Sequence, residues 1–376
     1  MPRVKQQTAH LAFLNAARAI MFACIVFDHT GEAVSDVVPP GTLQSALLAL
    51  APNGRYLFVT IAVVLIARSV SSSSLSRRLV VILTPFVAWS VITVGVDAVV
   101  GALPDESVGE LLWRLASGSA APHLYFVLVT VQLTIGAPII RALARTPGRL
   151  VLPLLLAAAL AQIATVVPEH HGGLERTLLY KTVLGYPLYI VGAAVLAPRI
   201  ALVRRWAVRA LPFVGLAVGV VGIGFAVAAF QSRSGALSGA AELVPLVLRQ
   251  VWVITVSLLS LCVCVVATRT NPTSGVVARI GRSMQDLGFG LYLAHALVLR
   301  AVVELTASVL PAVGLEFGIV VGWTATVVLT VLLVSALRWT PLSRVLTGRP
   351  RKRRRPQHRL DPVPSTVVGG LAGAGR

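Results

Sequence analysis

Apolar stretches of about 18–25 residues recur along almost the whole chain, and each is long enough to cross the hydrocarbon core of a bilayer as a helix. Within lipid, a backbone can satisfy its own hydrogen bonds only in helices or closed barrels. With 56% hydrophobic and 12% charged residues in 376, little of the chain is left for a soluble domain. The sequence therefore predicts an all-α polytopic membrane protein with about ten transmembrane helices, at residues 11–29, 55–70, 79–101, 123–143, 150–167, 178–197, 211–230, 244–267, 286–309 and 315–337.

The positions of Lys and Arg indicate the orientation of these helices, because cytoplasmic loops are enriched in both residues. If the N-terminus is cytoplasmic, most basic residues fall in inner loops or terminal segments, and the outer loops hold only Arg55, Arg114, Arg176 and Arg233. We therefore expect both termini to be cytoplasmic. The expected organisation is a cytoplasmic N-terminus at 1–10, a membrane domain at 11–340 and a basic, disordered cytoplasmic tail at 341–376.

The net charge of +19 does not by itself indicate a nucleic-acid partner. The charge is concentrated in the predicted inner loops and in the tail sequence RPRKRRRPQHRLDPVP, which has no aromatic side chains to stack on bases. A basic segment beside a membrane helix is typical of contact with anionic lipids. We expect membrane lipids as partners, no nucleic acid, and a multi-pass location in the cytoplasmic membrane of a bacterium.

The first apolar stretch, LNAARAIMFACIVFDH, carries an arginine, Arg18, and ends at His29. At 100° per residue, the eleven-residue spacing puts both side chains on one helix face, roughly 16 Å apart along the axis. Arginine suits an anionic group arriving from the cytoplasm, and histidine suits proton transfer near neutral pH. The alternative is that Arg18 pairs with a carbonyl or carboxylate of another helix and that His29 only lies in the headgroup region.

Other polar residues also fall in the predicted helices. His123 begins the fourth helix beside Tyr125, where an interfacial anchor is the alternative to a functional role. His295 lies near the middle of the ninth helix, where only a functional role or a buried hydrogen bond explains it. Arg300 and Glu304 are four residues apart and are expected to pair, whereas the roles of Lys181 and Arg249 stay open at this stage.

The sequence predicts no metal site and no bound cofactor. Cys24, Cys262 and Cys264 fall inside predicted helices and are interpreted as small apolar residues, because a CxC pair lacks the ligands of a zinc site. The adjacent His170 and His171 are expected in a solvated outer loop. We find no phosphate-binding loop, dinucleotide fingerprint, HExxH motif or internal repeat.

Four segments together resemble the membrane acyltransferase family 3, a group of ten-helix O-acyltransferases. The first helix, with Arg18 and His29, resembles the family's arginine-histidine pattern, and HLYFVLVTVQLTIGAPII is similar to its histidine-aromatic helix start. SRRLVVILTPFVAWSVI looks like its basic loop entering a proline-containing third helix, and IGRSMQDLGFGLYLAHALVL resembles its late serine-to-YLxH segment. This chain departs from the pattern at Asn15, Ala16 and Ala17, which replace an acidic-Gly-Leu run, and at Asp28.

The resemblance implies an O-acyltransferase that takes an acyl group, most simply acetyl, from cytoplasmic acyl-CoA. The acceptor would be a hydroxyl of an extracytoplasmic or lipid-linked glycan, a lipid or a related compound. The implied catalytic residues are His29, as general base or transient acyl carrier, Arg18, as a cation that binds the donor or positions the helix, and His123. The implied substrate-binding residues are Asp28, Tyr125, Tyr292 and His295.

Two other classes of function compete with acyl transfer. In a transporter or flippase, Arg18, Lys181, Arg249 and His295 would line a solute or proton path, although no inverted repeat supports this interpretation. A non-catalytic scaffold recruited through the basic tail is the third class. The sequence specifies neither the acyl chain length, nor the acceptor, nor the oligomeric state.

Overall fold

The computed structural model describes residues 12–51, 54–69, 74–102, 106–165, 179, 181–269 and 275–352. Every regular element within these ranges is a helix, so the predicted all-α class is confirmed for the described residues. The predicted N-terminal segment at 1–10, the pair His170 and His171, and the tail from residue 353 lie outside them.

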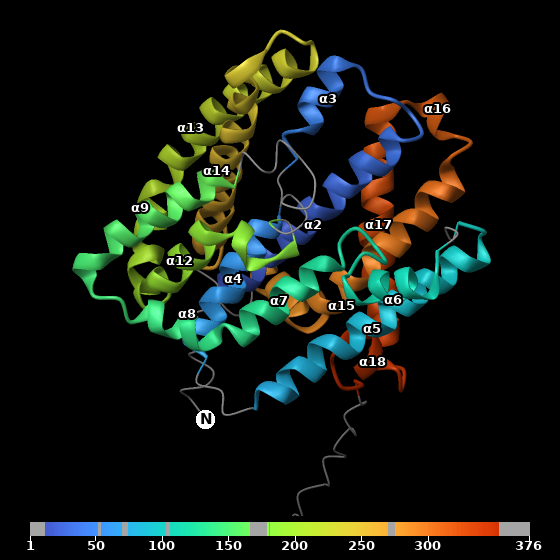
Figure 1. The fold of residues 1–376 in the computed structure, drawn as a ribbon, viewed down its shortest axis with the longest axis horizontal. Helices are drawn as coiled ribbons and strands as arrows, with labels where there is room; N and C mark the ends of the chain where they lie inside the picture. Colours follow the sequence, from blue (N-terminus) through green and yellow to red (C-terminus); the bar gives the residue numbers. More distant parts are fainter. Residues whose placement is uncertain are drawn as a thin grey trace, which may run out of the picture.

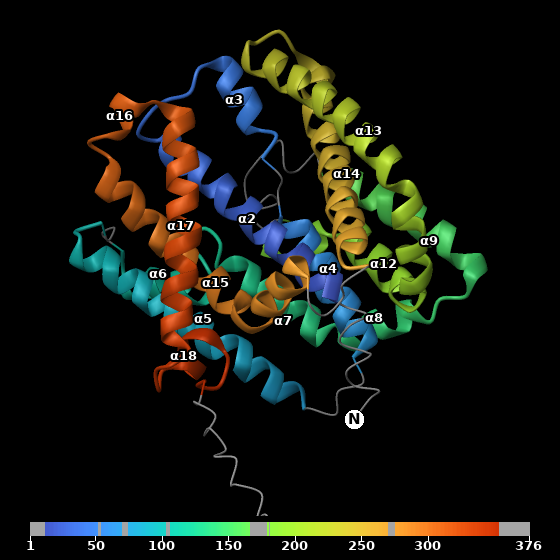
Figure 2. The ribbon, with the colours of Figure 1, turned by 180° about the vertical axis from the view of Figure 1, so that it is seen from behind.

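Helix α2 (Ala12–Ser35) lies at the centre of the molecule, with other helices on both sides of it (Figures 1 and 2). Small residues allow close contact on one side, since a Cβ on Gly281 would lie 3.1 Å from the carbonyl oxygen of Ala12. Leu14, Met21 and Val26 fill the core around this helix. The helices packed against α2 include α4 (Arg55–Arg68), α14 (Leu243–Ala267), α15 (Val276–Thr306) and α17 (Leu315–Leu337).

The predicted fourth span is broken in the structure. Helix α7 (Tyr125–Ile135) ends at Gly136, and α8 (Ala137–Ala144) continues at an angle of 62° to it. Pro138, at the start of α8, has no amide hydrogen for a continuing helix, and its ring would clash with the carbonyl four residues earlier. By contrast, Pro85 stays inside α5 (Leu75–Val99), as the sequence predicts.

Pro198 lies between the sixth and seventh predicted spans, which a short 3₁₀ turn joins in the structure. After α9 (Gly148–Ala164), helix α12 (Pro187–Leu196) enters the 3₁₀ turn η2 (Ala197–Arg199), which contains Pro198 and leads directly into α13 (Ile200–Arg233). Helix α13 packs along α14 as a long hairpin at one edge of the molecule (Figure 1). The turn of this hairpin contains η3 (Gly239–Glu242).

Among the described residues, six helices are long and apolar enough to cross a membrane, or seven if the bent pair of α7 and α8 is one span. The chain is thus a multi-pass membrane protein by the length and composition of its helices. The predicted count of about ten is not confirmed, although each predicted segment contains a helix. The difference arises because α4 and α9 have only 14 and 17 residues, and because α12 continues through η2 into α13, so that Pro187–Arg233 counts as one span.

Short helices complete the described structure: α3 (Thr42–Leu48), α6 (Val108–Ala116), η1 (Val183–Gly185), α16 (Leu310–Val313) and α18 (Ser343–Thr347). The segment predicted as a tail begins inside this folded part. Arg338 donates to Asp286 Oδ1 at 2.7 Å, and Lys352 Nζ lies 3.1 Å from Asp286 Oδ2. The Lys352 ion pair, together with hydrogen bonds from Arg338 to Ser343 Oγ and to the carbonyl oxygen of Pro350, holds residues 341–352 against α15 and α17.

Candidate active site

Three histidines from distant parts of the sequence meet in the structure. His29 comes from the second half of α2, His123 from the turn before α7, and His295 from the middle of α15. The ring centroids of His123 and His295 are 4.6 Å apart, and those of His29 and His295 are 5.7 Å apart with the rings stacked. Tyr292, one turn before His295, contacts both His123 and His295 with its ring. The structure therefore brings four of the predicted site residues together.

Main-chain carbonyls fix the protonation of the two buried histidines. His123 Nε2 lies 3.3 Å from the carbonyl oxygen of Leu293, and His295 Nδ1 lies 2.6 Å from that of Tyr292. Because a carbonyl oxygen only accepts, each of these nitrogens carries the hydrogen and donates it. The other ring nitrogen of each histidine is buried without a hydrogen-bond partner in the described part of the chain, which favours the neutral form.

His29 differs from the other two histidines in its partner and its exposure. Its Nδ1 lies 3.1 Å from Glu32 Oε2, one turn further along α2, and its side chain is 22% exposed. A carboxylate only accepts hydrogen bonds, so Nδ1 carries a hydrogen, and in the neutral form of the ring the lone pair is on Nε2. This is the arrangement of a general base held and oriented by a carboxylate. Glu32 was not among the predicted site residues, although the spacing of three residues between His29 and Glu32 on one helix indicates the contact.

His29 and His123 line a cavity of about 780 Å³, which we call the histidine cavity. Tyr125, another predicted site residue, also lines it, whereas His295 and Tyr292 contact His123 but are not among the lining residues. Lys181, whose role the sequence left open, lines the same cavity and donates to Ser119 Oγ at 2.6 Å. Cationic, hydroxyl and carboxylate groups thus surround the exposed edge of His29.

A charge network closes one wall of the histidine cavity. Asp97 of α5 is buried and accepts from Arg114 Nη2 at 2.5 Å and from Arg300 Nη1. Arg300 Nε also donates to Glu304 Oε1 at 2.7 Å, so the predicted pairing of these two residues is confirmed. Arg300 and Arg114, from α15 and α6, are therefore joined through one carboxylate of α5.

Gly118 allows the turn that carries His123 to pack closely against the start of α7. Gly118 has φ of +70°, a left-handed conformation that glycine adopts without a steric penalty. A Cβ at this position would lie 2.7 Å from the Cα atom of Tyr125, closer than real contacts allow. The turn that carries His123 can therefore fold back on the start of α7 only with glycine here.

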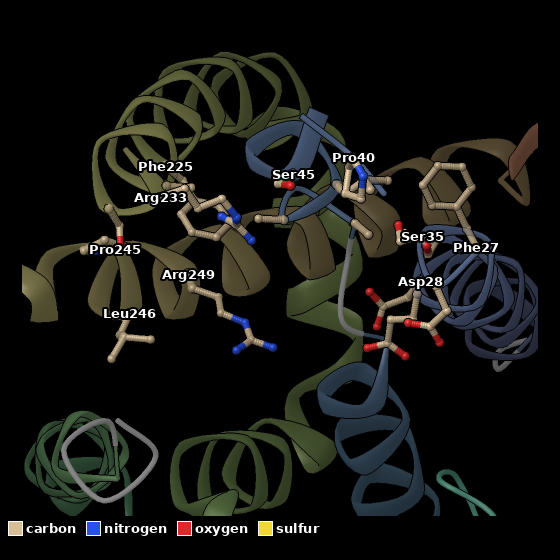
Figure 3. Close-up of a pocket in the computed structure, with 18 residues that line it drawn as sticks. Phe27, Asp28, Ser35, Pro40, Ser45, Phe225, Arg233, Pro245, Leu246 and Arg249 are labelled. Atoms are coloured by element: carbon tan, nitrogen blue, oxygen red, sulfur yellow. Dashed lines mark hydrogen bonds between the residues drawn. The ribbon is translucent and has the colours of Figure 1, made fainter. Parts of the chain in front are cut away.

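A second cavity, of about 620 Å³, lies beside α2 (Figure 3). Asp28 extends into it from α2, and Arg249 extends into it from α14 on the opposite wall. Arg233 lines the same cavity, and Glu32 and Asp36 line both this cavity and the histidine cavity. Asp28 therefore faces a separate, mixed-charge space and does not contact the histidines, in agreement with its 100° offset from His29.

Arg18 lies towards the opposite end of α2, away from the histidine cluster. Its Nη1 donates to Asn15 Oδ1 at 3.5 Å, the limit of a hydrogen bond, and its Nε is buried with no partner in the described residues. The positive charge of Arg349, from the segment after α18, acts on it unfavourably. A partly buried guanidinium in this setting is suited to receive an anionic group.

The three cysteines do not form a metal site in the structure. Cys24 is half-buried, and Cys262 and Cys264 are buried; all are free thiols packed among apolar side chains. Within the described ranges, no group of three or more His, Cys, Asp or Glu side chains is arranged to hold a metal ion.

Comparison with known proteins connects this site to a family. The family model described as "Acyltransferase domain" matches residues 11–339, which contain every residue of the histidine cluster. No curated protein and no solved structure gives a significant match to the chain. The family match covers nearly the whole chain and all of the candidate site, and the chain therefore belongs to this acyltransferase family.

Proposed function

We propose that this membrane acyltransferase moves an acyl group, most simply acetyl, from acyl-CoA to a hydroxyl group of an extracytoplasmic or lipid-linked glycan, a lipid or a related acceptor. The observation that carries the proposal is the pairing of His29 with Glu32 at the edge of the histidine cavity. Acyl transfer to a hydroxyl needs a base at the acceptor oxygen, and this pair supplies one.

In the proposed reaction, His29 Nε2 takes the proton of the acceptor hydroxyl while the hydroxyl oxygen attacks the thioester carbonyl carbon. The tetrahedral intermediate collapses with cleavage of the carbon–sulfur bond. The proton on His29 passes to the departing sulfur, so the products are an oxygen ester and a free thiol. Glu32 stabilises the imidazolium that forms between these two proton transfers.

The two buried histidines act as positioning residues in this scheme. His295 stacks on His29, and His123 packs against His295. Both are held in one orientation by main-chain carbonyls of α15. They limit the movement of the His29 ring, which keeps Nε2 directed at the acceptor.

Two cavities along α2 could hold the acceptor. The histidine cavity would hold the reacting hydroxyl, and the mixed-charge cavity with Asp28 and Arg249 would hold a further polar part of the same molecule, because Glu32 and Asp36 line both spaces. The donor would approach from the end of α2 that carries Arg18, which the distribution of basic residues predicts to be cytoplasmic. Arg18 would bind an anionic group of that donor.

The test is transfer of labelled acetyl from acetyl-CoA into membranes that contain the protein. We expect label in an acceptor from which mild alkali releases acetate, since oxygen esters are hydrolysed under those conditions. Membranes containing a His29→Gln variant provide the matched control, because this substitution keeps a polar side chain of similar length and removes the base. Equal labelling with wild type and variant would contradict the proposal.

A further inference from the structure

A third cavity, of about 870 Å³, lies at the end of the molecule where α2 begins, and we call it the arginine cavity. Its charged residues come from three parts of the chain. Arg68 is the last residue of α4, Arg269 follows the end of α14, and the other arginines lie in the first turns of α13. Among the described residues that line it, none is a carboxylate. The arginines of the cavity are Arg68, Arg204, Arg205, Arg209 and Arg269.

Two of these arginines are held by contacts on the protein side. Arg68 Nη1 donates to the carbonyl oxygen of Ala197 at 3.0 Å, at the proline break before α13. The guanidinium of Arg204 lies 6.0 Å from the ring centroid of Phe13, in the first turn of α2. The break between α12 and α13 and the start of α2 therefore fix where this positive charge is placed.

Arg205, Arg209 and Arg269 have no acidic partner within the described part of the chain. Arg205 and Arg209 are four residues apart on α13, where like charges repel each other across one helical turn. Arg269 brings a further positive charge from α14 to the same space. A general preference for basic residues in cytoplasmic loops explains arginines at this end of the molecule, but not their convergence on one cavity. Arg145, which caps α8, and Arg149, in the first turn of α9, do not line it.

We propose that the arginine cavity binds a ligand that carries two or more phosphate groups. Arginine binds phosphate oxygens through paired, charge-assisted hydrogen bonds, and several such forks suit a multiply charged anion. Trp206 and Leu202, 46% and 63% exposed, also line the cavity and offer an apolar surface beside the charge. Two sources share this chemistry: the phosphorylated nucleotide of a soluble compound, and the headgroup of an anionic phospholipid.

Binding is measured with the full-length protein in nanodiscs of uncharged phosphatidylcholine. One arm titrates adenosine 3′,5′-bisphosphate, and the other titrates nanodiscs that contain cardiolipin. Wild type is compared with Arg205→Ala/Arg209→Ala and with the matched control Arg145→Ala/Arg149→Ala, which removes the same charge outside the cavity. We expect the cavity variant to weaken binding of one probe by about tenfold or more, with the control close to wild type.

The two arms identify the source. A loss confined to the nucleotide arm assigns the cavity to a soluble phosphorylated ligand, and a loss confined to the cardiolipin arm assigns it to a lipid headgroup. The proposal is overturned if neither probe binds, or if both double variants weaken binding equally. If the alanine variant does not fold, Arg205→Lys/Arg209→Lys replaces it, because lysine keeps the charge but loses the paired hydrogen bonds. The assay needs no turnover, so its outcome is independent of the proposed acyl transfer.

Discussion

The histidine cavity and the arginine cavity of this acyltransferase family member differ in how their charged side chains are paired. In the histidine cavity, each charged network contains both signs: Asp97 lies between two arginines, and Glu32 holds His29. In the arginine cavity, five arginines converge, and no carboxylate is among the described residues that line it. The charged groups of the first cavity have partners within the protein, whereas we propose that an anion balances the charge of the second.

This contrast separates two roles within one fold. In the proposed reaction, the group that transfers a proton needs a fixed position, which the contacts of His29 with Glu32 and with the ring of His295 provide. Groups that recognise a multiply charged anion need unneutralised positive charge. The comparison therefore predicts that substitutions at the two cavities affect different measurements.

The largest expected effect is on acyl transfer by His29→Ala. Removing the base should lower the rate by about 100- to 10,000-fold, the usual contribution of general base catalysis. The measurement is labelled acetyl transfer to membranes, with thermal unfolding as the control for folding. Binding of the phosphorylated probes should not change. A variant that transfers acetyl at the wild-type rate would remove His29 from the chemistry.

Asp97→Asn should give the next largest effect, a decrease in the free energy of unfolding. Arg114 and Arg300 would then face each other across a neutral amide, and we expect a loss of about 1–3 kcal/mol, reduced from the value for a fully buried pair because both arginines reach solvent. Thermal unfolding in detergent measures the change. The double variant Arg205→Ala/Arg209→Ala, which removes repelling charges, should unfold at or above the wild-type temperature without ligand. Destabilisation of both variants to the same extent would contradict the contrast between the cavities.

Glu32→Gln should lower transfer by about tenfold, the equivalent of about 1.4 kcal/mol, because an amide cannot stabilise the imidazolium as a carboxylate does. The readout is the acetyl transfer rate with the acceptor concentration held fixed. Glu316→Gln is the matched control, since Glu316 accepts from the Gln44 amide and lines none of the three cavities. If both glutamine variants behave like wild type, Glu32 does not orient the base.

Tyr292→Phe should give the smallest effect. The phenol donates to the main-chain carbonyl of His123, and its removal should cost about 0.5–1.5 kcal/mol of stability. Because the ring remains, the packing against His123 and His295 is kept. A calorimetric unfolding curve measures the change. A loss of transfer far larger than the loss of stability would instead make the hydroxyl a part of the reaction.

Much of this architecture follows from the sequence, because apolar length and helical periodicity are local properties. The all-helical class, the shared face of Arg18 and His29, and the pairing of Arg300 with Glu304 depend only on distances along one helix. The bend at Gly136 was missed because apolar composition continues across it. Pro138, two residues later, was the available signal.

The contacts that build the candidate site depend on packing between distant helices. His123 and His295 are separated by 172 positions in the sequence and are in ring contact, which no local pattern encodes. Asp97 joins α6 and α15 for the same reason. The arginine cavity could not be predicted from the sequence either. Its residues come from three separate segments, which the sequence analysis used only to predict cytoplasmic loops.

The most direct test of the account is thiol release from acetyl-CoA by the purified protein, measured with and without a crude glycolipid acceptor. The account predicts acceptor-dependent thiol release by wild type and by Glu316→Gln. It also predicts loss of release in His29→Ala, and weaker use of acetyl-CoA in Arg18→Ala, with all four proteins folded. If the folded wild type neither binds nor cleaves acetyl-CoA, or if His29→Ala releases thiol at the same acceptor-dependent rate, acyl transfer at the histidine cavity is contradicted and a transport role gains support.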